Sequence, residues 1–366
     1  MASPEQTEVR RLLDIAIRTP ESVPALPPRE LDMLLRVARR AGVLGRLAAR
    51  LDDSGDLAKL PAAAADQLTG RLVMAESRVR LANWELDRIA WAMADDTETP
   101  LVLMKGCTYV LLGLPNAPGR VFADVDLLTV EDRLEYVEAT LNRAGWLSQP
   151  LKPYDQNYYR KWTHELPPLT HPEREVEIDL HHNVLPRTAR LKPDGVRLLE
   201  RSRALSGTRY RVLSEEDIVL HAMTHLMFDS DLADKLRDLV DVADLIDHFS
   251  AASDGFWDIL IERATELDLE RPAFYSLRYC QRFLGTELPG PVLDALARWS
   301  PVAPVRALMD ALAERALFPL HPDRPSRWAR LSRLLLYMRS HWIRMPPWLL
   351  TYHLTVKFLR TRLFRD

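Results

Sequence analysis

The stretch LVLMKGCTYVLLGLPNAPGRVFADVDLLT, from Leu101 to Thr129, decides the fold that we predict for this chain. It predicts an apolar strand, a Lys-Gly turn, a short apolar helix, a loop and a second strand that carries Asp124 and Asp126. Residues two apart in an extended chain share a face, so these two carboxylates point together. Paired oxygen ligands without cysteine suit a hard cation such as Mg²⁺, with Mn²⁺ as an alternative.

A second acidic strand strengthens this prediction, because an isolated Asp-x-Asp pair often only ends a strand. In EVEIDLH, from Glu175 to His181, apolar residues alternate with Glu177, Asp179 and His181, which is the period of a half-buried strand. Like charges along one face repel each other unless something positive lies opposite them. A metal ion or a metal-bound nucleotide would remove this conflict.

These motifs, together with Lys105-Gly106 and Arg120, resemble the uncharacterised nucleotidyltransferase family of the DNA polymerase β-type superfamily. The resemblance extends over roughly residues 30 to 290. It implies an α+β fold, in which helical regions flank a small mixed β-sheet, and a helix behind the Gly-containing turn that receives the triphosphate. It also implies that Asp124 and Asp126 bind two metal ions and that Asp179 completes the triad. The usual Gly-Ser turn of the superfamily is replaced here by Lys105-Gly106.

Two basic residues near the acidic strands have alternative interpretations. Lys105, at the mouth of the first strand, could neutralise a phosphate or be a surface lysine. Arg120 could clamp a phosphate or form an ion pair with Asp124. With Gly106, both are candidate nucleotide-binding residues.

Two further candidates lie on the later strand and on a later helix. His181 could touch the nucleotide or orient Asp179, although a histidine at a strand end is more often packed or solvated. Arg237 could reach the base or a phosphate across the cleft. The simpler interpretation of Arg237 is an i, i+4 salt bridge to Asp241 within one helix.

Other site chemistries are poorly supported by the sequence. His221 and His225 have i, i+4 spacing but lack the glutamate of a zinc protease, and we expect them to be core histidines of an apolar helix. No Gly-x-Ser-x-Gly turn of a hydrolase and no Gly-rich nucleotide loop occurs. Phosphate recognition therefore has to come from the metal, the turn amides and scattered basic residues. His164, in WTHELPPL, could begin another strand.

The composition of the chain is that of an ordinary globular protein, with 47% hydrophobic and 28% charged residues over 366 positions. This length predicts more than one domain. We expect an N-terminal helical region at 1–95, a nucleotidyltransferase core at 96–195, a helical domain at 196–320 and a basic aromatic tail at 321–366. The first region is expected to cap the sheet, with a partner-binding module as the alternative. Cys107 and Cys280 form no metal-ligand spacing, which favours reduced thiols in a cytoplasmic protein.

The tail carries ten Lys or Arg and two Asp, and ten minus two gives +8 in a chain of net charge −3. Aromatic residues, among them Trp328, Trp342 and Phe358, lie between these basic residues. Three interpretations stay open: a solvated helical face whose aromatics fill the core, contact with an anionic membrane surface, and contact with RNA. The sequence contains no apolar run long enough to span a bilayer.

We therefore expect a Mg²⁺-dependent enzyme that transfers an NMP from an NTP, ATP by default, to an acceptor hydroxyl and releases pyrophosphate. From the resemblance, the acceptor is a small molecule, a sugar, a peptide or RNA. Two other hypotheses remain: a toxin-like enzyme that modifies tRNA, and a catalytically silent protein that binds a nucleotide or a partner.

Overall fold

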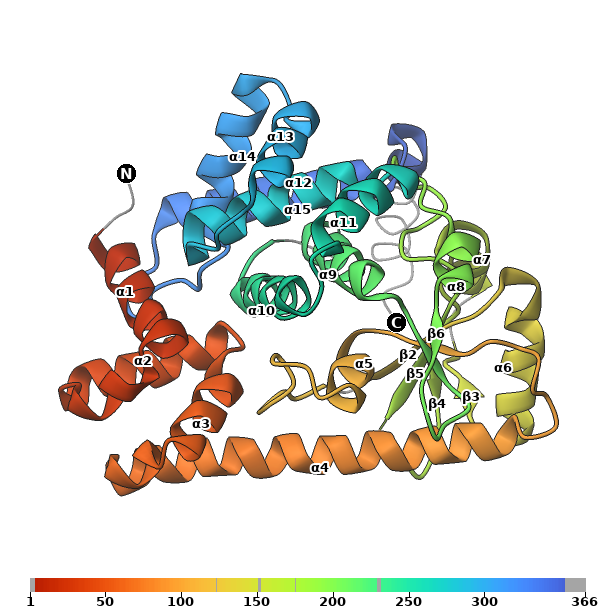
Figure 1. The fold of residues 1–366 in the computed structure, drawn as a ribbon, viewed down its shortest axis with the longest axis horizontal. Coiled ribbons are helices and arrows are strands. Elements are labelled where there is room, and N and C mark those ends of the chain that lie inside the picture. Colours follow the sequence, from red (N-terminus) through yellow and green to blue (C-terminus); the bar gives the residue numbers. More distant parts are fainter. Residues whose placement is uncertain (1–3, 123, 151–152, 175, 229–231, 353–366) are drawn as a thin grey trace, which may run out of the picture.

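The computed structural model describes residues 4–122, 124–150, 153–174, 176–228 and 232–352 (Figure 1). Glu175 of the predicted acidic strand and Phe358 of the predicted tail lie outside these residues. The described helices are α1 (Pro4–Arg18), α2 (Pro28–Arg40), α3 (Leu44–Asp53), α4 (Ala62–Ala92), α5 (Lys105–Leu111), α6 (Leu134–Arg143), α7 (Pro153–Trp162), α8 (Gly195–Glu200), α9 (Glu215–Phe228), α10 (Leu236–Ala252), α11 (Phe256–Glu266), α12 (Glu270–Tyr279), α13 (Gly290–Trp299), α14 (Ala303–Ala316) and α15 (Arg327–Arg344). The strands are β1 (Val102–Leu103), β2 (Asp124–Leu128), β3 (Leu147–Ser148), β4 (Leu169–Thr170), β5 (Glu177–His181), β6 (Arg203–Ala204) and β7 (Arg211–Val212).

The seven described strands form one mixed sheet in the order β3-β4-β5-β2-β1-β7-β6. Its two parallel pairs are β2 with β5 and β1 with β7, and the remaining neighbours are antiparallel. With helical regions on both sides of it in the chain, this sheet confirms the predicted α+β class. β5 begins at Glu177, two residues later than the start predicted from the sequence.

The back face of the sheet is covered by α4 and α6. Val125 and Leu127 of β2 pack there in one apolar cluster with Leu86 of α4 and Val137 of α6. The 31 residues of α4 give it a length of about 46 Å, and it runs along the whole molecule from α3 to the sheet (Figure 1). α6 follows β2 in the chain, and Gly145, with φ +106°, comes just after its C-terminal end, where glycine is favoured.

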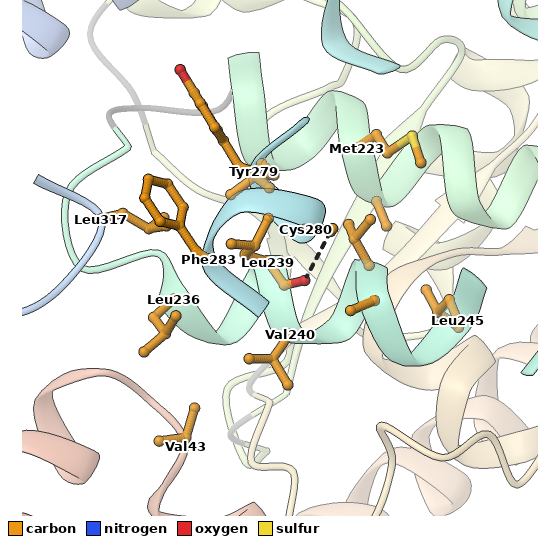
Figure 2. Close-up of a cluster of buried hydrophobic side chains, with 14 of the residues drawn as sticks. Val43, Met223, Leu236, Leu239, Val240, Leu245, Tyr279, Cys280, Phe283 and Leu317 are labelled. Carbon is orange, nitrogen blue, oxygen red and sulfur yellow. Dashed lines mark hydrogen bonds between the residues drawn. The ribbon is translucent and has the colours of Figure 1, made fainter. Parts of the chain in front are cut away.

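On the other side of the sheet from α4 lies a layer of helices built on α9, α10 and α12, with α14 and α15 beyond them, in the upper part of the view (Figure 1). A second apolar cluster joins this layer to the N-terminal helices, and it contains Val43, Leu236 and Leu317 (Figure 2). In the same cluster Cys280 donates a hydrogen bond to the Leu239 carbonyl at 3.7 Å. Cys280 and Cys107 are both buried free thiols, as predicted.

The N-terminal helical region expected from the sequence contains α2. Pro28 is the first residue of α2, where its missing N–H costs nothing, and the apolar stripe of this helix, which includes Leu34 and Val37, is buried. α3, which the sequence interpretation did not single out, turns the chain from α2 into α4. Within the described part of the chain, no helix combines the length and the apolarity needed to cross a membrane.

Candidate active site

The register of β2 against β5 brings the predicted acids together. Asp126 lies opposite Asp179, and Asp124 lies opposite Glu177. The side chains that alternate with these residues are fully buried in the apolar cluster between the sheet, α4 and α6. They are Val125, Leu127, Ile178 and Leu180. Because successive side chains of a strand point to opposite faces, the acids are on the front face, where α9 supplies the facing wall.

Asp126 is the most connected of the acids, with only 2% of its surface exposed. It accepts hydrogen bonds from Lys105 Nζ at 2.7 Å and from His181 Nε2 at 3.0 Å. Burial alone would raise the pKa of Asp126, but the charges and hydrogen bonds of Lys105 and His181 outweigh it and hold this pKa well below the usual range. Asp126 is therefore ionised, and since a carboxylate only accepts, Nε2 of His181 carries the hydrogen.

Asp124 and Asp179 have the opposite shift. Burial, and then the charge of Asp126, raise the pKa of both carboxyls, and that of Asp179 reaches about 7. Burial lowers the pKa of His181, but Asp126 raises it more, so Lys105 and His181 together bring two positive charges to three carboxylates, and the cluster remains short of positive charge. A cation that entered the cluster would offset this shortage.

Two overlapping groups of side chains in the described residues could hold a metal ion. The first is Asp126, Asp179 and His181, whose ligand atoms lie within 4.8 Å of one another. The second is His164, Glu165 and His181, with the same limit on their separation. Asp124 belongs to neither group.

Lys105 is the first residue of α5 and has φ +49°, a backbone conformation that a side chain makes costly. The turn directs its ammonium group to Asp126. Although burial lowers the pKa of Lys105, the Asp126 carboxylate raises it more, so the side chain stays charged. Gly106 lies beside it, and a Cβ there would be 3.0 Å from the Phe122 ring. Lys105 is thus part-buried rather than a surface lysine, and its ammonium group is the counter-ion of Asp126.

The structure corrects the predicted ion pairs of both arginines. Arg120 does not pair with Asp124 but with Asp241 of α10, and its guanidinium lies 4.9 Å from the centre of the Tyr109 ring. Arg237 does not pair with Asp241, one helical turn away. It bonds the neighbouring Asp238 through Nε at 3.0 Å and Nη2 at 2.9 Å. The physical reason is that Asp241 is already engaged by the more deeply buried Arg120.

Two cavities meet at Asp124. The first, of about 280 Å³, is lined by Lys105, Gly106, Arg120, Phe122, Arg237 and Asp238, among others. The second, of about 540 Å³, is lined by Asp179, His164, Glu165, Tyr159, His221 and Arg344, among others. Lys105, Asp124 and His225 line both. Asp124 therefore lies between one cavity that contains the two candidate arginines and a larger one with histidines and tyrosines, which Asp179 also lines.

The cavity residues that were not predicted as site residues include His164, Glu165, His221 and His225. His164 and Glu165 reach the site because Glu165 forms an isolated antiparallel bridge with His181, and one bridge leaves no periodic pattern in a sequence. The rings of His164 and His181 are 5.4 Å apart. His221 and His225 were interpreted as core residues, yet their i, i+4 spacing was the signal that they share one face of α9. Burial lowers the pKa of His164 and of His221 well below the usual value, so both are neutral.

Comparisons with known proteins agree with this geometry. The model of a family described as "Uncharacterised nucleotidyltransferase" matches residues 27–285, which is more than half of the chain. The chain belongs to this family. The resemblance expected from Lys105-Gly106, the Asp-x-Asp pair and Asp179 is thereby confirmed. The match includes every candidate site residue predicted from the sequence and ends before α13, so α13 to α15 lie outside it.

Searches against individual proteins add little to the family assignment. No match was found among the curated proteins. Among solved structures, the chain is similar to one titled "Crystal structure of JHP933 from Helicobacter pylori", with 15% identity, a TM-score of 0.31, and coverage of 73% of this chain and 95% of that chain. The nucleotidyltransferase family name fixes the general type of reaction, the transfer of a nucleotidyl group from a nucleoside triphosphate.

Proposed function

We propose that this nucleotidyltransferase transfers an NMP from an NTP, with ATP as the default donor, to an acceptor hydroxyl and releases pyrophosphate in a Mg²⁺-dependent reaction. The observation that carries the proposal is the Asp126–Asp179 pair, held side by side across β2 and β5, with Asp124 at the junction of two cavities. The bond formed joins the acceptor oxygen to the α-phosphorus. The bond broken joins that phosphorus to the oxygen of the leaving pyrophosphate.

The donor set fits the metal. Asp124, Asp126 and Asp179 provide carboxylate oxygens, which Mg²⁺ and Mn²⁺ prefer, and a cation there would offset the charge of Asp126 that, after burial, raises the pKa of Asp124 and of Asp179. Mg²⁺ bound by these residues would neutralise the triphosphate and stabilise the attacking and leaving oxygens. His181 would hold Asp126 in orientation through its 3.0 Å hydrogen bond.

The first cavity is the proposed nucleotide site. Lys105, Arg120 and Arg237 bring three cationic side chains to it, and Gly106 keeps the turn free of a side chain. Asp238 and Asp241 already bind the two arginines, so these acids hold the guanidinium groups in place for the phosphates.

The second cavity is the proposed acceptor site, since it reaches Asp124 and Asp179 from the other direction. Its volume of about 540 Å³ is in the range of a small-molecule pocket. Apolar residues such as Val184 and Phe228 face neutral His164 and His221 there. In this arrangement the cavity walls bind and orient the acceptor so that its hydroxyl lies beside Asp179.

One observation favours a second candidate, a nucleotide-binding protein without catalysis. Oδ1 of Asp126 already bonds both Lys105 and His181, so a metal ion at this oxygen has to compete with these two groups. A protein that kept the fold but lost turnover would show the same contacts.

The deciding experiment measures nucleotide binding and pyrophosphate release with each of the four NTPs, with and without Mg²⁺ or Mn²⁺. We expect metal-dependent turnover that is lost in Asp124→Asn/Asp126→Asn and in Asp179→Asn. Asp258→Asn, an exposed acid on α11, is the matched control and should retain it. Metal-dependent binding without turnover, even with an added low-molecular-weight cell extract as acceptor source, would favour the binding protein. Absence of any nucleotide binding would refute both candidates.

A further inference from the structure

α15 carries a continuous stripe of large apolar side chains on its outer surface. Trp328, Leu331, Leu335, Met338 and Trp342 follow one another at spacings of three and four residues, so they lie along one side of the helix. Their exposed fractions are 65%, 43%, 39%, 59% and 48%. We call these five residues the α15 stripe. The interpretation that the aromatics of this segment fill the core is therefore wrong for Trp328 and Trp342.

The opposite side of α15 is anchored, which fixes the direction of the stripe. Ala329, Ser332, Leu336 and Ser340 are buried, and the helix packs on α14 and α9. Three further bonds hold it along its length: Arg333 to Asp234 at 3.0 Å, Arg339 to the Met227 carbonyl at 3.3 Å and Arg344 to the Phe228 carbonyl at 2.5 Å. The stripe therefore cannot turn inward without breaking these contacts.

The charged residues of α15 itself are all basic. α15 contains five arginines and no aspartate or glutamate, and Arg327 and Arg330 at its N-terminal end are exposed. Over residues 321–366 the sequence carries ten basic and two acidic residues, a difference of +8. A partner for this surface has to accept apolar side chains and be negatively charged.

We propose that the α15 stripe docks on an anionic lipid bilayer surface, with α15 parallel to the membrane plane. Indole rings suit the headgroup level because one edge is apolar and the N–H can hydrogen-bond, and Trp328 and Trp342 lie at the two ends of the stripe. The apolar side chains between them enter the boundary of the acyl chains, and the exposed Arg327 and Arg330 meet the lipid phosphates. Trp348 and Tyr352, 61% and 55% exposed, follow α15 in the chain, and the Trp348 ring packs edge-on against Trp162 of α7.

Two other occupants fit the surface less well. A second copy of the chain would place one arginine-rich helix against another without any acid on α15 to compensate. RNA phosphates could form ion pairs with the exposed arginines. They offer no apolar surface, however, on which the five side chains of the stripe could be buried. An anionic bilayer satisfies both features at once.

Vesicle co-sedimentation of the full-length protein tests the proposal. We expect binding to phosphatidylcholine vesicles that contain about one-third phosphatidylglycerol, weaker binding at high salt, and little binding to phosphatidylcholine alone. Trp328→Ser/Leu335→Ser/Trp342→Ser should weaken the binding roughly tenfold or more. Val73→Ser/Met74→Ser/Trp91→Ser on α4 removes side chains of similar exposure and is the matched control, with no loss expected.

A second measurement separates docking from a folding defect. Brominated lipids should quench the tryptophan fluorescence of the wild type and of the α4 control, and much less that of the α15 variant at equal bound protein. The proposal would be overturned if the wild-type protein did not bind anionic vesicles. It would also be overturned if the α15 variant and the α4 control bound them equally well. An α15 variant that changed only the oligomeric state or only RNA binding would overturn it as well, because the stripe would then belong to a second copy or to nucleic acid.

Discussion

At the scale of single residues, Asp126 determines which of the three carboxyl groups in the site are ionised. It faces Lys105 and His181 at hydrogen-bond distance and lies opposite Asp179 in the sheet. Its ionisation is stabilised by two neighbours, whereas Asp124 and Asp179 are pushed toward their neutral forms by burial and by Asp126 itself. The three carboxylates therefore differ in charge even before a ligand binds.

Replacing Asp126 should destabilise the fold, apart from any effect on activity. Asp126→Asn leaves the Lys105 ammonium group part-buried without its counter-ion, and we expect the free energy of unfolding to fall by about 2 kcal/mol. Asp124→Asn is the matched control: it removes a charge that its surroundings disfavour, and its effect should lie between none and a small gain. Urea unfolding with an unchanged m-value measures both. Equal losses in the two variants would contradict this account of Asp126.

Binding of Mn²⁺ should release a proton from Asp179. The pKa of Asp179 is raised from 3.8 to about 7, first by burial and then by Asp126, so the carboxyl is neutral below about pH 7 and has to ionise to bind a cation. The affinity should fall about tenfold per pH unit below pH 7 and level off above it. Calorimetry across this range measures the slope. The slope should vanish in Asp179→Asn, and its persistence there would assign the proton to another group.

The raised pKa of Asp179 also determines how the stability of the ion-free protein depends on pH. Between about pH 4 and pH 7 the unfolded chain has already lost the Asp179 proton while the folded chain keeps it. Asp179 therefore makes the ion-free fold less stable as the pH rises through this window.

At the scale of elements, the loop that ends in Arg120 is positioned by its contact with α3. An added Cβ on Gly119 would lie 2.0 Å from the Gly45 carbonyl oxygen, and one on Gly45 would lie 1.9 Å from the Gly119 oxygen. Gly119 also has φ +70°, a region that favours glycine. Any side chain at this contact forces α3 away from the loop.

A pair of glycine variants separates the contact from the backbone conformation. Gly113 has φ +62° with open space around it, so Gly113→Ala should cost only about 1 kcal/mol of stability. Gly119→Ala carries a similar conformational cost plus the clash, and we expect a loss of about 3 kcal/mol and weaker NTP binding through Arg120. Thermal unfolding and nucleotide titration measure the two effects. Equal losses of stability in Gly113→Ala and Gly119→Ala would show that the contact with α3 does not contribute.

Much of this site follows from short-range sequence patterns, and the parts that do not are long-range. Alternation in β2 and β5 predicts which face carries Asp124 and Asp179, because a strand allows only two faces. Nothing local indicates that Arg120 meets Asp241, 121 residues later in the chain. The i, i+4 rule failed for Arg237 because Asp241 was taken by Arg120. His164 and Glu165 gave no periodic signal, since they join the sheet through a single bridge.

At the scale of the whole molecule, the N-terminal and C-terminal helices share one apolar cluster and one carboxylate. Asp234 accepts a hydrogen bond from Arg40 of α2 at 2.9 Å and from Arg333 of α15 at 3.0 Å. Arg46 of α3 also forms an ion pair with Asp244 of α10. The ranges 1–95, 96–195, 196–320 and 321–366 remain our proposal for the organisation of the chain, and these contacts connect three of them.

We therefore expect the helices at the two ends of the chain to open together. Native-state hydrogen exchange should give peptides of α2 and α14 similar opening free energies. Both helices belong to the second apolar cluster, the one that contains Val43, Leu236 and Leu317. Peptides from the exposed middle of α4, around Val73, should open more readily. If α2 exchanged far faster than α14 under the same conditions, the N-terminal region would be an independently folding unit.

The ion pair between Lys105 and Asp126 has a consequence for the order of events in the proposed reaction. A divalent ion bound to Oδ1 of Asp126, the oxygen that accepts from Lys105, would exchange with the ammonium group, and Lys105 also lines the nucleotide cavity. The displaced ammonium then becomes available to the triphosphate as the ion arrives. Lys105 would thus act as a placeholder in the resting enzyme and as a phosphate ligand in the loaded one, which favours ordered loading with the ion ahead of the nucleotide.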